Sequence, residues 1–531
     1  MIAITVALTS ALYVSRLGFY SDDWSFLRTF SFAKDQSLTG LVQSFFEADA
    51  NTRARPLQAL YLAVLYQLFG LQPFGYHVVN ALVFAGGLCT FYVALRTFTE
   101  NRLFSLAVVL VYGTLPHYST DRFWYAAFQA NLSMALYFAS FYCSLRQLTS
   151  FGAMYSVWAI AAALSLIGSV MSYEVFIPLF LVNCLLVGIK QWQLAQISGA
   201  TALRARDLAS LYLAPPVVLA LLISFKNSVT KRGGAPHWSQ LDDALPAAFE
   251  LTVGAYGVNL PRVLDVIFRE HFDWAILGIA LAAAGGIWLY LMRVAQHDRA
   301  PVPTRLTLAL ILVGSAAIAG LSYAYFYSYF RVSTGVNNRV ANAAAVCVAL
   351  FLVSGLALAA NLLRLRFEGA ISCLAVAAIC GCGALITNTV ATFWLNASRA
   401  QAEILEGLRS AWESPPPGSS ILLTGYCAWI GPGIVFETDW DVTGAVGLLY
   451  RDRTLTGNVL RPWMVVEKDG LRDSDSFYSF ASLYVYDART REVHRVAGER
   501  AAAQLLRAVI ADDASGCVGD YKAFGAGMPI W

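Results

Sequence analysis

Two adjacent carboxylates, Asp22 and Asp23, are the side chains of this chain best suited to chemistry. They follow the first apolar segment in the sequence Phe-Tyr-Ser-Asp-Asp-Trp, which ends at Trp24. Two neighbouring carboxylates beside an apolar segment do not both ionise easily, so one can take the raised pKa that a general base needs. The alternatives are a divalent cation bound between them and a merely polar cap on the apolar segment. We expect a catalytic or metal-binding site here.

The composition identifies the surroundings of this pair. The chain has 531 residues, of which 58% are hydrophobic and 13% are charged. Soluble domains carry about 25% charged residues, so the composition predicts an integral membrane protein. The net charge of +3 is small, which predicts that nucleic acid is not a partner. Ionisable groups at membrane depth are rare and usually functional, which strengthens the expectation for the carboxylate pair.

Eleven apolar segments are close to the length of about 20 residues that a helix needs to cross a bilayer. The segment 56–70 is shorter and predicts a helix at the membrane interface. Residues 1–18 are interpreted as a signal anchor, since no small-residue cleavage site precedes Asp22. The predicted fold class is a polytopic α-helical membrane protein with about 11 transmembrane helices. The predicted spans are 1–18, 75–96, 103–117, 126–146, 152–171, 174–190, 208–226, 274–294, 305–326, 338–362 and 369–394.

Positive charges predict the orientation of these spans. Loops rich in arginine and lysine stay in the cytoplasm. The carboxylate pair, the long loops 19–55 and 227–272, and everything after residue 395 then face outward. We therefore predict a multi-pass protein of the cytoplasmic membrane with its polar site on the periplasmic or extracytoplasmic side. The positive loops contain Arg96, Arg102, Arg146, Lys190, Arg204, Arg206, Arg293, Arg299, Arg305, Arg364 and Arg366.

The tail predicts a second domain. We divide the chain into a transmembrane domain of residues 1–395 and a small extracytoplasmic α/β domain of residues 396–531. Within the tail we predict a strand at 421–425, a hairpin of 477–486 with 492–496, and a helix at 499–510. This domain is expected to cap the membrane cavity, to hold an acceptor, or only to stabilise the fold. Cys427 and Cys517 could form a disulfide if the tail is exported.

Several motifs near the carboxylate pair carry a family resemblance. Arg53-Ala-Arg55-Pro-Leu follows the first outer loop, and Gly-x-x-Pro and Tyr-His77-x-x-Asn80 come next. Together with Asp-Asp-Trp, these motifs resemble the GT-C superfamily of membrane glycosyltransferases, in particular its protein O-mannosyltransferase-like branch. The resemblance covers about residues 10–190. It implies inverting transfer of a sugar from a polyprenyl-phosphate carrier to an acceptor outside the membrane, with one acid of the first outer loop as the catalytic or metal-associated residue.

That chemistry needs cations and substrate-binding groups on the same side of the membrane. Guanidinium groups pair bidentately with phosphate, and Arg55 is favoured because it matches the family position. Arg339 is next, because it begins an apolar span. The candidate phosphate-binding residues are Arg55, Arg53, Arg339 and Arg331. The candidate substrate-binding residues are Trp24, Tyr173, Glu174, His77, Lys231 and Arg232. Any metal ion would bind Asp22 and Asp23.

Other activities are weighed against this one. A glycan polymerase or ligase would use the same lipid-linked donor at the same face. A lipid or polysaccharide transporter would typically show repeats and broken helices at the membrane midplane, whereas the polar residues here gather at one face. The expected partners are a polyprenyl-phosphate sugar donor, membrane lipids, and a glycan, protein or lipid acceptor. Asp121 and Arg122 are expected to form a local ion pair.

Overall fold

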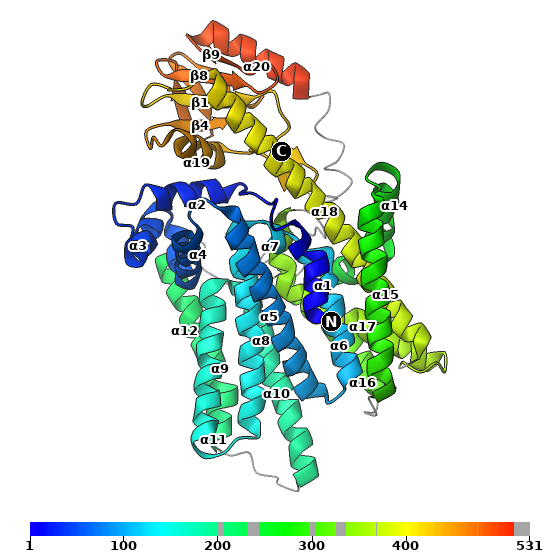
Figure 1. Cartoon of the computed structure of the whole chain (residues 1–531). Coiled ribbons are helices and arrows are strands. Elements are labelled where there is room, and N and C mark those ends of the chain that lie inside the picture. Colours follow the sequence, from blue (N-terminus) through cyan, green and yellow to red (C-terminus); the bar gives the residue numbers. More distant parts are fainter. Residues whose placement is uncertain are drawn as a thin grey trace.

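The computed structural model describes residues 1–198, 205–230, 244–297, 303–324, 336–367, 369–474 and 476–513. It consists of a bundle of long helices with a smaller domain of strands and helices at one end (Figure 1). Three short helices near the N-terminus, α2, α3 and α4, lie at that same end of the bundle. They separate much of the bundle from the C-terminal domain.

The N-terminal elements place the carboxylate pair at the boundary between bundle and C-terminal domain. The segment predicted as the first span forms only the eight-residue helix α1 and one turn of 3-10 helix, η1. The interfacial helix predicted at 56–70 is present as α4, which begins at a proline, the residue best tolerated in a first turn. The bounds are α1 Ile2–Thr9, η1 Ala11–Tyr13, α2 Asp22–Ser31, α3 Leu38–Ala48, η2 Ala50–Ala54 and α4 Pro56–Phe69.

The bundle confirms the prediction of a multi-pass membrane protein. Among the described residues, eight helices are long and apolar enough to cross a membrane. Helix α6 has 13 residues and is buried from Leu103 to Thr114, so it forms the centre of the bundle. The eight long apolar helices contain α5 Pro73–Thr99, α9 Gly152–Ser172, α10 Ile177–Ser198, α12 Ala214–Val229, α15 Trp274–His297, α16 Arg305–Ala324, α17 Asn342–Leu362 and α18 Ala370–Ala411. Helix α8 Phe128–Leu148 is of similar length but is not among the eight.

The outside of the bundle is apolar. Large hydrophobic side chains are exposed on several of its helices, as a surface in contact with lipid tails requires. They include Leu82, Leu164, Leu185, Leu221, Leu289 and Leu310.

Shorter elements connect the long helices: α6 Arg102–Thr114, η3 Pro116–Tyr118, α7 Thr120–Phe123, η4 Tyr125–Ala127, η5 Glu174–Phe176, α11 Ala205–Asp207, η6 Leu208–Leu213, α13 Ala244–Phe249, η8 Glu250–Asn259, α14 Leu260–Glu270 and η9 Val336–Ala341.

Helix α18 joins the two parts of the molecule. It has 42 residues, so the boundary predicted between residues 395 and 396 falls inside it. Its C-terminal half leaves the bundle and packs beside the strands of the C-terminal domain (Figure 1). Because one helix belongs to both parts, the orientation of the domain is fixed relative to the bundle.

The C-terminal domain contains a mixed sheet in the order β4-β1-β8-β9, in which β1 is parallel to β4 and β8. The predicted strand at 421–425, the turn between β8 and β9, and the final helix are confirmed. The prediction of one strand over 477–486 is wrong, because β7 and β8 belong to different sheets. The bounds are β1 Ser420–Thr424, β2 Trp429–Ile430, β3 Gly433–Ile434, α19 Asp439–Tyr450, β4 Thr456–Val459, β5 Val465–Glu467, β6 Gly470–Asp473, β7 Ser476–Ser479, β8 Leu483–Asp487, β9 Glu492–Arg495 and α20 Glu499–Asp513.

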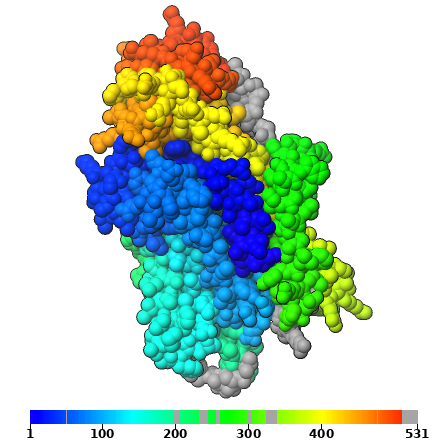
Figure 2. Space-filling view, in the orientation of Figure 1, coloured from blue at the N-terminus to red at the C-terminus, as the bar shows by residue number. Residues whose placement is uncertain are grey.

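Helix α19 is seated directly on α2. A Cβ atom added at Gly444 would lie 2.4 Å from the carbonyl carbon of Trp24, so only glycine allows the two helices to approach this closely. Arg28 of α2 donates to the carbonyl of Arg453 at 2.6 Å. In the space-filling view, the blue N-terminal elements lie against the yellow and orange C-terminal domain (Figure 2). The C-terminal domain therefore holds the helix that carries the carboxylate pair.

Candidate functional site

Helix α2 begins abruptly at the carboxylate pair. Ser21 precedes it with a φ of 46°, in the left-handed region that serine seldom adopts. This turn puts Asp22 and Asp23 into the first turn of α2, where the helix dipole favours negative charge. Their side chains have different partners, and the two residues are therefore not equivalent.

Asp23 is completely buried and bound to the backbone on both sides. One carboxylate oxygen accepts from the N–H of Tyr20 at 2.8 Å and the other from the N–H of Ala126 at 2.7 Å. Burial raises the pKa of Asp23 well above its usual range, and the backbone hydrogen bonds oppose this. Through these two bonds Asp23 fastens α2 to η4.

Asp22 is the partly exposed member of the pair. It accepts a hydrogen bond from the indole of Trp440 in the C-terminal domain, and the charges of Arg339 and Asp49 act on it. Burial raises the pKa of Asp22. The charge of Arg339 and the hydrogen bond from Trp440 oppose this rise, the charge of Asp49 adds to it, and the net shift is upward. A partly exposed carboxylate with a raised pKa has the properties of a general base. Asp22 thus has accessible surface, whereas Asp23 has none.

Arg339 provides positive charge beside Asp22. It lies in η9, and its guanidinium carbon is 4.6 Å from the centre of the Trp124 ring. Its charge also acts on the carboxyl groups of Asp121 and Glu437. Stacking on an aromatic ring holds a guanidinium in place without neutralising it. Arg339 therefore remains able to bind an anion next to Asp22.

A second group of cations surrounds Glu174. Arg55 makes a bidentate ion pair with Glu174, with Nε donating to Oε2 at 3.0 Å and Nη2 donating to Oε1. Lys226 donates to Oε2 of Glu174 at 3.2 Å and to the carbonyl of Ala54 at 2.7 Å. Arg55 also lies over the ring of Tyr173, at 4.7 Å from its centre. Arg55 and Lys226 thus share the carboxylate of Glu174.

Sequence reasoning did not select Lys226. Its position at the end of an apolar span is a weak signal, because a lysine there usually extends its ammonium group toward the membrane surface. Arg55, Tyr173 and Glu174 were selected separately, and the structure brings these three together.

The other predicted residues lie elsewhere or outside the described residues. Exposed Arg53 donates to the carbonyl of Phe46 at 2.9 Å, on the side of α3. Trp24 packs against Phe19 and, in the C-terminal domain, Phe436. The predicted residues Lys231, Arg232 and Arg331 lie outside the described residues.

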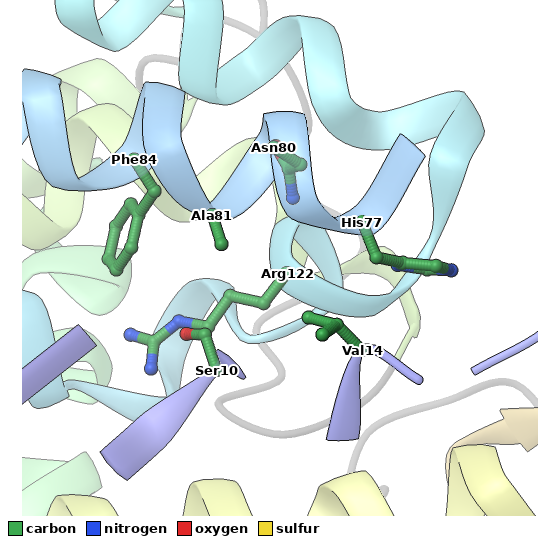
Figure 3. A pocket seen from close by; sticks show the side chains of 7 residues that line it. All are labelled: Ser10, Val14, His77, Asn80, Ala81, Phe84 and Arg122. Atoms are coloured by element: carbon green, nitrogen blue, oxygen red, sulfur yellow. The ribbon is translucent and has the colours of Figure 1, made fainter. Parts of the chain in front are cut away.

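His77 is buried away from the carboxylate pair. Its Nε2 atom lies 3.1 Å from the carbonyl oxygen of Gly18. It lines a narrow pocket at the ends of η1 and α7 and along α5, which Figure 3 shows from close by. The pocket is lined by Ser10, Val14, His77, Asn80, Ala81, Phe84 and Arg122. His77, a candidate substrate-binding residue, thus contacts the segment before α2 through Gly18.

The expected ion pair between Asp121 and Arg122 is not formed in this part of the described chain. Asp121 accepts from the amide of Asn342 at 2.8 Å. Arg122 donates to the carbonyls of Gly113 and Leu115, both at 3.1 Å. The two side chains point to different partners because α7 is a single short turn between buried elements.

Glu437 is the acid that sequence reasoning missed. It precedes α19, and its Oε1 atom accepts a hydrogen bond from Oγ of Ser21 at 2.6 Å, across 416 residues of sequence. Burial raises the pKa of Glu437 to about 7, the hydrogen bond from Ser21 opposes this, and the charge of Asp22 adds to it. No local sequence pattern around Glu437 predicts this contact, because it depends on the packing of α19 against α2.

The described residues contain no group of three or more histidine, cysteine, aspartate or glutamate side chains placed to hold a metal ion. At the predicted position between Asp22 and Asp23, each oxygen of Asp23 already accepts one backbone hydrogen, which leaves Asp22 the less engaged carboxylate. Asp22 is therefore the carboxylate of the pair that is open to a cation.

The group around Glu174 makes a stability prediction. Removing one partner of a buried ion pair destabilises a protein by about 3–5 kcal/mol, whereas removing both destabilises it less. We expect Glu174→Gln to lower the thermal unfolding temperature in detergent, and Glu174→Gln combined with Lys226→Met to recover part of the loss. Glu47→Gln, at an exposed glutamate that accepts from Gln43, is the matched control. Additive effects of the two substitutions would contradict the shared ion pair.

Comparisons with known proteins give distant similarity. No protein-family model matches the sequence, and no curated protein matches it. Among solved structures, the chain is similar to ArnT from Cupriavidus metallidurans, in one structure bound to undecaprenyl phosphate and in another in the apo state. Both are 14% identical with a TM-score of 0.37, and the matches cover 85% of this chain and 84% and 83% of those chains. A global similarity this low does not define the activity of the chain.

Proposed function

We propose that this chain is a GT-C-type glycosyltransferase, which transfers a sugar from a polyprenyl-phosphate donor to an acceptor at the outer face of the cytoplasmic membrane. One observation carries the proposal. The partly exposed carboxylate Asp22 lies at the end of an apolar helical bundle, under the charge of the guanidinium of Arg339. A base beside a cation at the membrane boundary suits a reaction between a hydroxyl group and a lipid phosphate ester.

The proposed reaction is a single displacement. Asp22 accepts the proton of an acceptor hydroxyl as its oxygen attacks the anomeric carbon. The bond from this carbon to the phosphate oxygen breaks on the opposite face, and its electron pair stays on the phosphate. Arg339 stabilises the charge that develops there. The sugar is transferred with inversion.

Two features support the outward orientation of this site. The positive loops predict that residues beyond 395 leave the cytoplasm. Cys427 is disulfide-bonded, and its expected partner, Cys517, lies outside the described residues. Disulfides persist mainly in oxidising compartments. If transfer needs a divalent cation, Asp22 is its proposed ligand.

The decisive experiment uses the full chain in lipid nanodiscs. Short-chain polyprenyl-phosphate hexoses and pentoses are supplied together with extracts of the cell envelope, with and without a chelator of divalent cations. We expect release of polyprenyl phosphate from at least one donor, with the sugar recovered in a larger product. A ladder of product sizes would indicate a polymerase instead of a single addition.

A lipid transporter would give a different result. Intact fluorescent donor would cross the bilayer of reconstituted vesicles, and Asp22→Asn would not change its rate. Transport of this kind without release of polyprenyl phosphate from any donor would overturn the proposed function.

A further inference from the structure

We propose that Glu437 and Trp440, both from the C-terminal domain, are positioning residues that fix the orientation of Asp22. Glu437 has a second role, because in its neutral form it adds no negative charge to the site where the donor binds. This inference rests on the proposed function. It gives the C-terminal domain a part in the reaction that a stabilising appendage would not have.

Glu437 and Trp440 contact two consecutive residues of the N-terminal segment. Glu437 accepts the hydroxyl hydrogen of Ser21 at 2.6 Å, and the indole of Trp440 donates to Asp22. Ser21 has a φ of 46°, and non-glycine residues in unusual backbone regions persist only when their surroundings hold them. The bond to Glu437 holds the turn that aims Asp22.

The segment that carries Glu437 is itself rigid. Asp441 accepts from the N–H of Glu437 at 2.7 Å and from the N–H of Thr438 at 3.0 Å, which completes a capping box at the start of α19. Phe436 packs on Trp24 with ring centres 6.3 Å apart. The position of Glu437 is thus fixed from both sides, by α19 and by α2.

The charges around Glu437 come from four elements. Asp22 of α2 and Asp441 of α19 are the neighbouring carboxyl groups, and Arg339 of η9 and Arg461, in the segment between β4 and β5, are the neighbouring cations. Asp22 itself also faces Asp49. The donor brings at least one further negative charge. With Asp22 ionised, a neutral Glu437 leaves Arg339 available to the phosphate, whereas an ionised Glu437 competes for it.

The pH dependence follows from this competition. The pKa of Glu437 is raised to about 7, so its carboxyl group is largely neutral below pH 7 and ionised above it. As pH rises through 7, the second negative charge should weaken donor binding. The kcat/KM for donor should then fall toward tenfold per pH unit, the limit for loss of one essential proton.

Glu437→Gln tests whether ionisation of Glu437 causes the fall in kcat/KM above pH 7. The side-chain amide keeps an oxygen for the Ser21 hydroxyl and cannot ionise. We expect the fall in kcat/KM above pH 7 to disappear, with KM rather than kcat responsible for the difference from wild type. The control is Glu467→Gln, an exposed glutamate of the same domain that pairs with Arg472; its pH profile should match that of wild type.

Trp440→Phe tests the second contact. It removes the indole N–H and keeps an aromatic ring. Because that hydrogen bond orients the carboxylate of Asp22, we expect kcat to fall while the KM for donor stays close to that of wild type. The thermal unfolding temperature should stay close to that of wild type, since Trp440 is exposed.

The outcomes are distinct. Superimposable pH profiles of wild type and Glu437→Gln would overturn the inference while leaving the proposed function intact. Inactivity of Glu437→Gln equal to that of Asp22→Asn would also overturn it, because Glu437 would then be a base. Absence of transfer by the wild-type protein with every donor would overturn the proposed function itself, and this inference with it.

Discussion

Asp22→Asn should lower the rate of sugar transfer by about 10³-fold, within the range that general base catalysis contributes. The amide has nearly the same shape as the carboxylate and still offers an oxygen to the indole of Trp440. It cannot accept the proton of the acceptor hydroxyl. The measurement is release of polyprenyl phosphate in nanodiscs at saturating donor, so that a change in kcat is separated from a change in binding.

Asp23→Asn is the matched comparison. Its amide nitrogen would have to face one of the two backbone N–H groups that the carboxylate now binds. Losing a hydrogen bond to a charged group destabilises by about 1.5–3 kcal/mol. We expect a lower thermal unfolding temperature and a loss of activity that follows the loss of folded protein.

The reverse pattern would exchange the two roles. If Asp23→Asn were folded but inactive while Asp22→Asn remained active, the buried acid would have to be the base. Equal, complete loss of activity in two stably folded variants would show that the pair acts as a unit, as in carboxylate dyads.

The sequence pointed to this pair and could not separate its members. Which carboxylate turns inward depends on the left-handed turn at Ser21 and on the N–H of Ala126, which lies 103 residues away in sequence. Apolar periodicity and loop charge are local signals, so they predicted most of the bundle. Partners across the fold are not local, and they decide the role of each acid.

The same contrast explains the other results. Arg55 was selected because it matches the family position and Glu174 because it begins an apolar span, yet the ion pair that joins them spans 119 residues. Lys226 escaped notice because a single lysine at the end of a span usually reaches toward the membrane surface. Glu437 was missed because its importance comes from the close packing of Gly444 on α2.

The strand misassigned over 477–486 has a simpler cause. Its residues are apolar or aromatic except for Ser479 and Ser482, so the sequence reads as one long strand. The structure turns the chain there, with the N–H of Ser482 donating to the carbonyl of Ser479 at 3.0 Å. Neither glycine nor proline marks that turn.

Arg339→Met should lower kcat by about 10²–10³-fold, comparable to the loss of one donor from an oxyanion hole. Methionine preserves an apolar contact with Trp124 but removes the charge that acts on Asp22 and on the departing phosphate. Arg339→Lys keeps a positive charge but lacks the planar guanidinium group, so its kcat should lie between those of wild type and Arg339→Met. If Arg339 acts mainly in the transition state, kcat and kcat/KM should fall together.

Arg53→Met distinguishes this local effect from a general loss of positive charge. Arg53 is exposed and donates to the carbonyl of Phe46, so its removal should change transfer by less than about threefold, as expected for a screened surface charge. A large loss with Arg53→Met and a small one with Arg339→Met would mean that the donor phosphate lies on the side of α3. The reaction would then take place away from the stack of Arg339 on Trp124. Asp22 would have no phosphate-binding cation beside it, and the arrangement that supports Asp22 as the base would be absent.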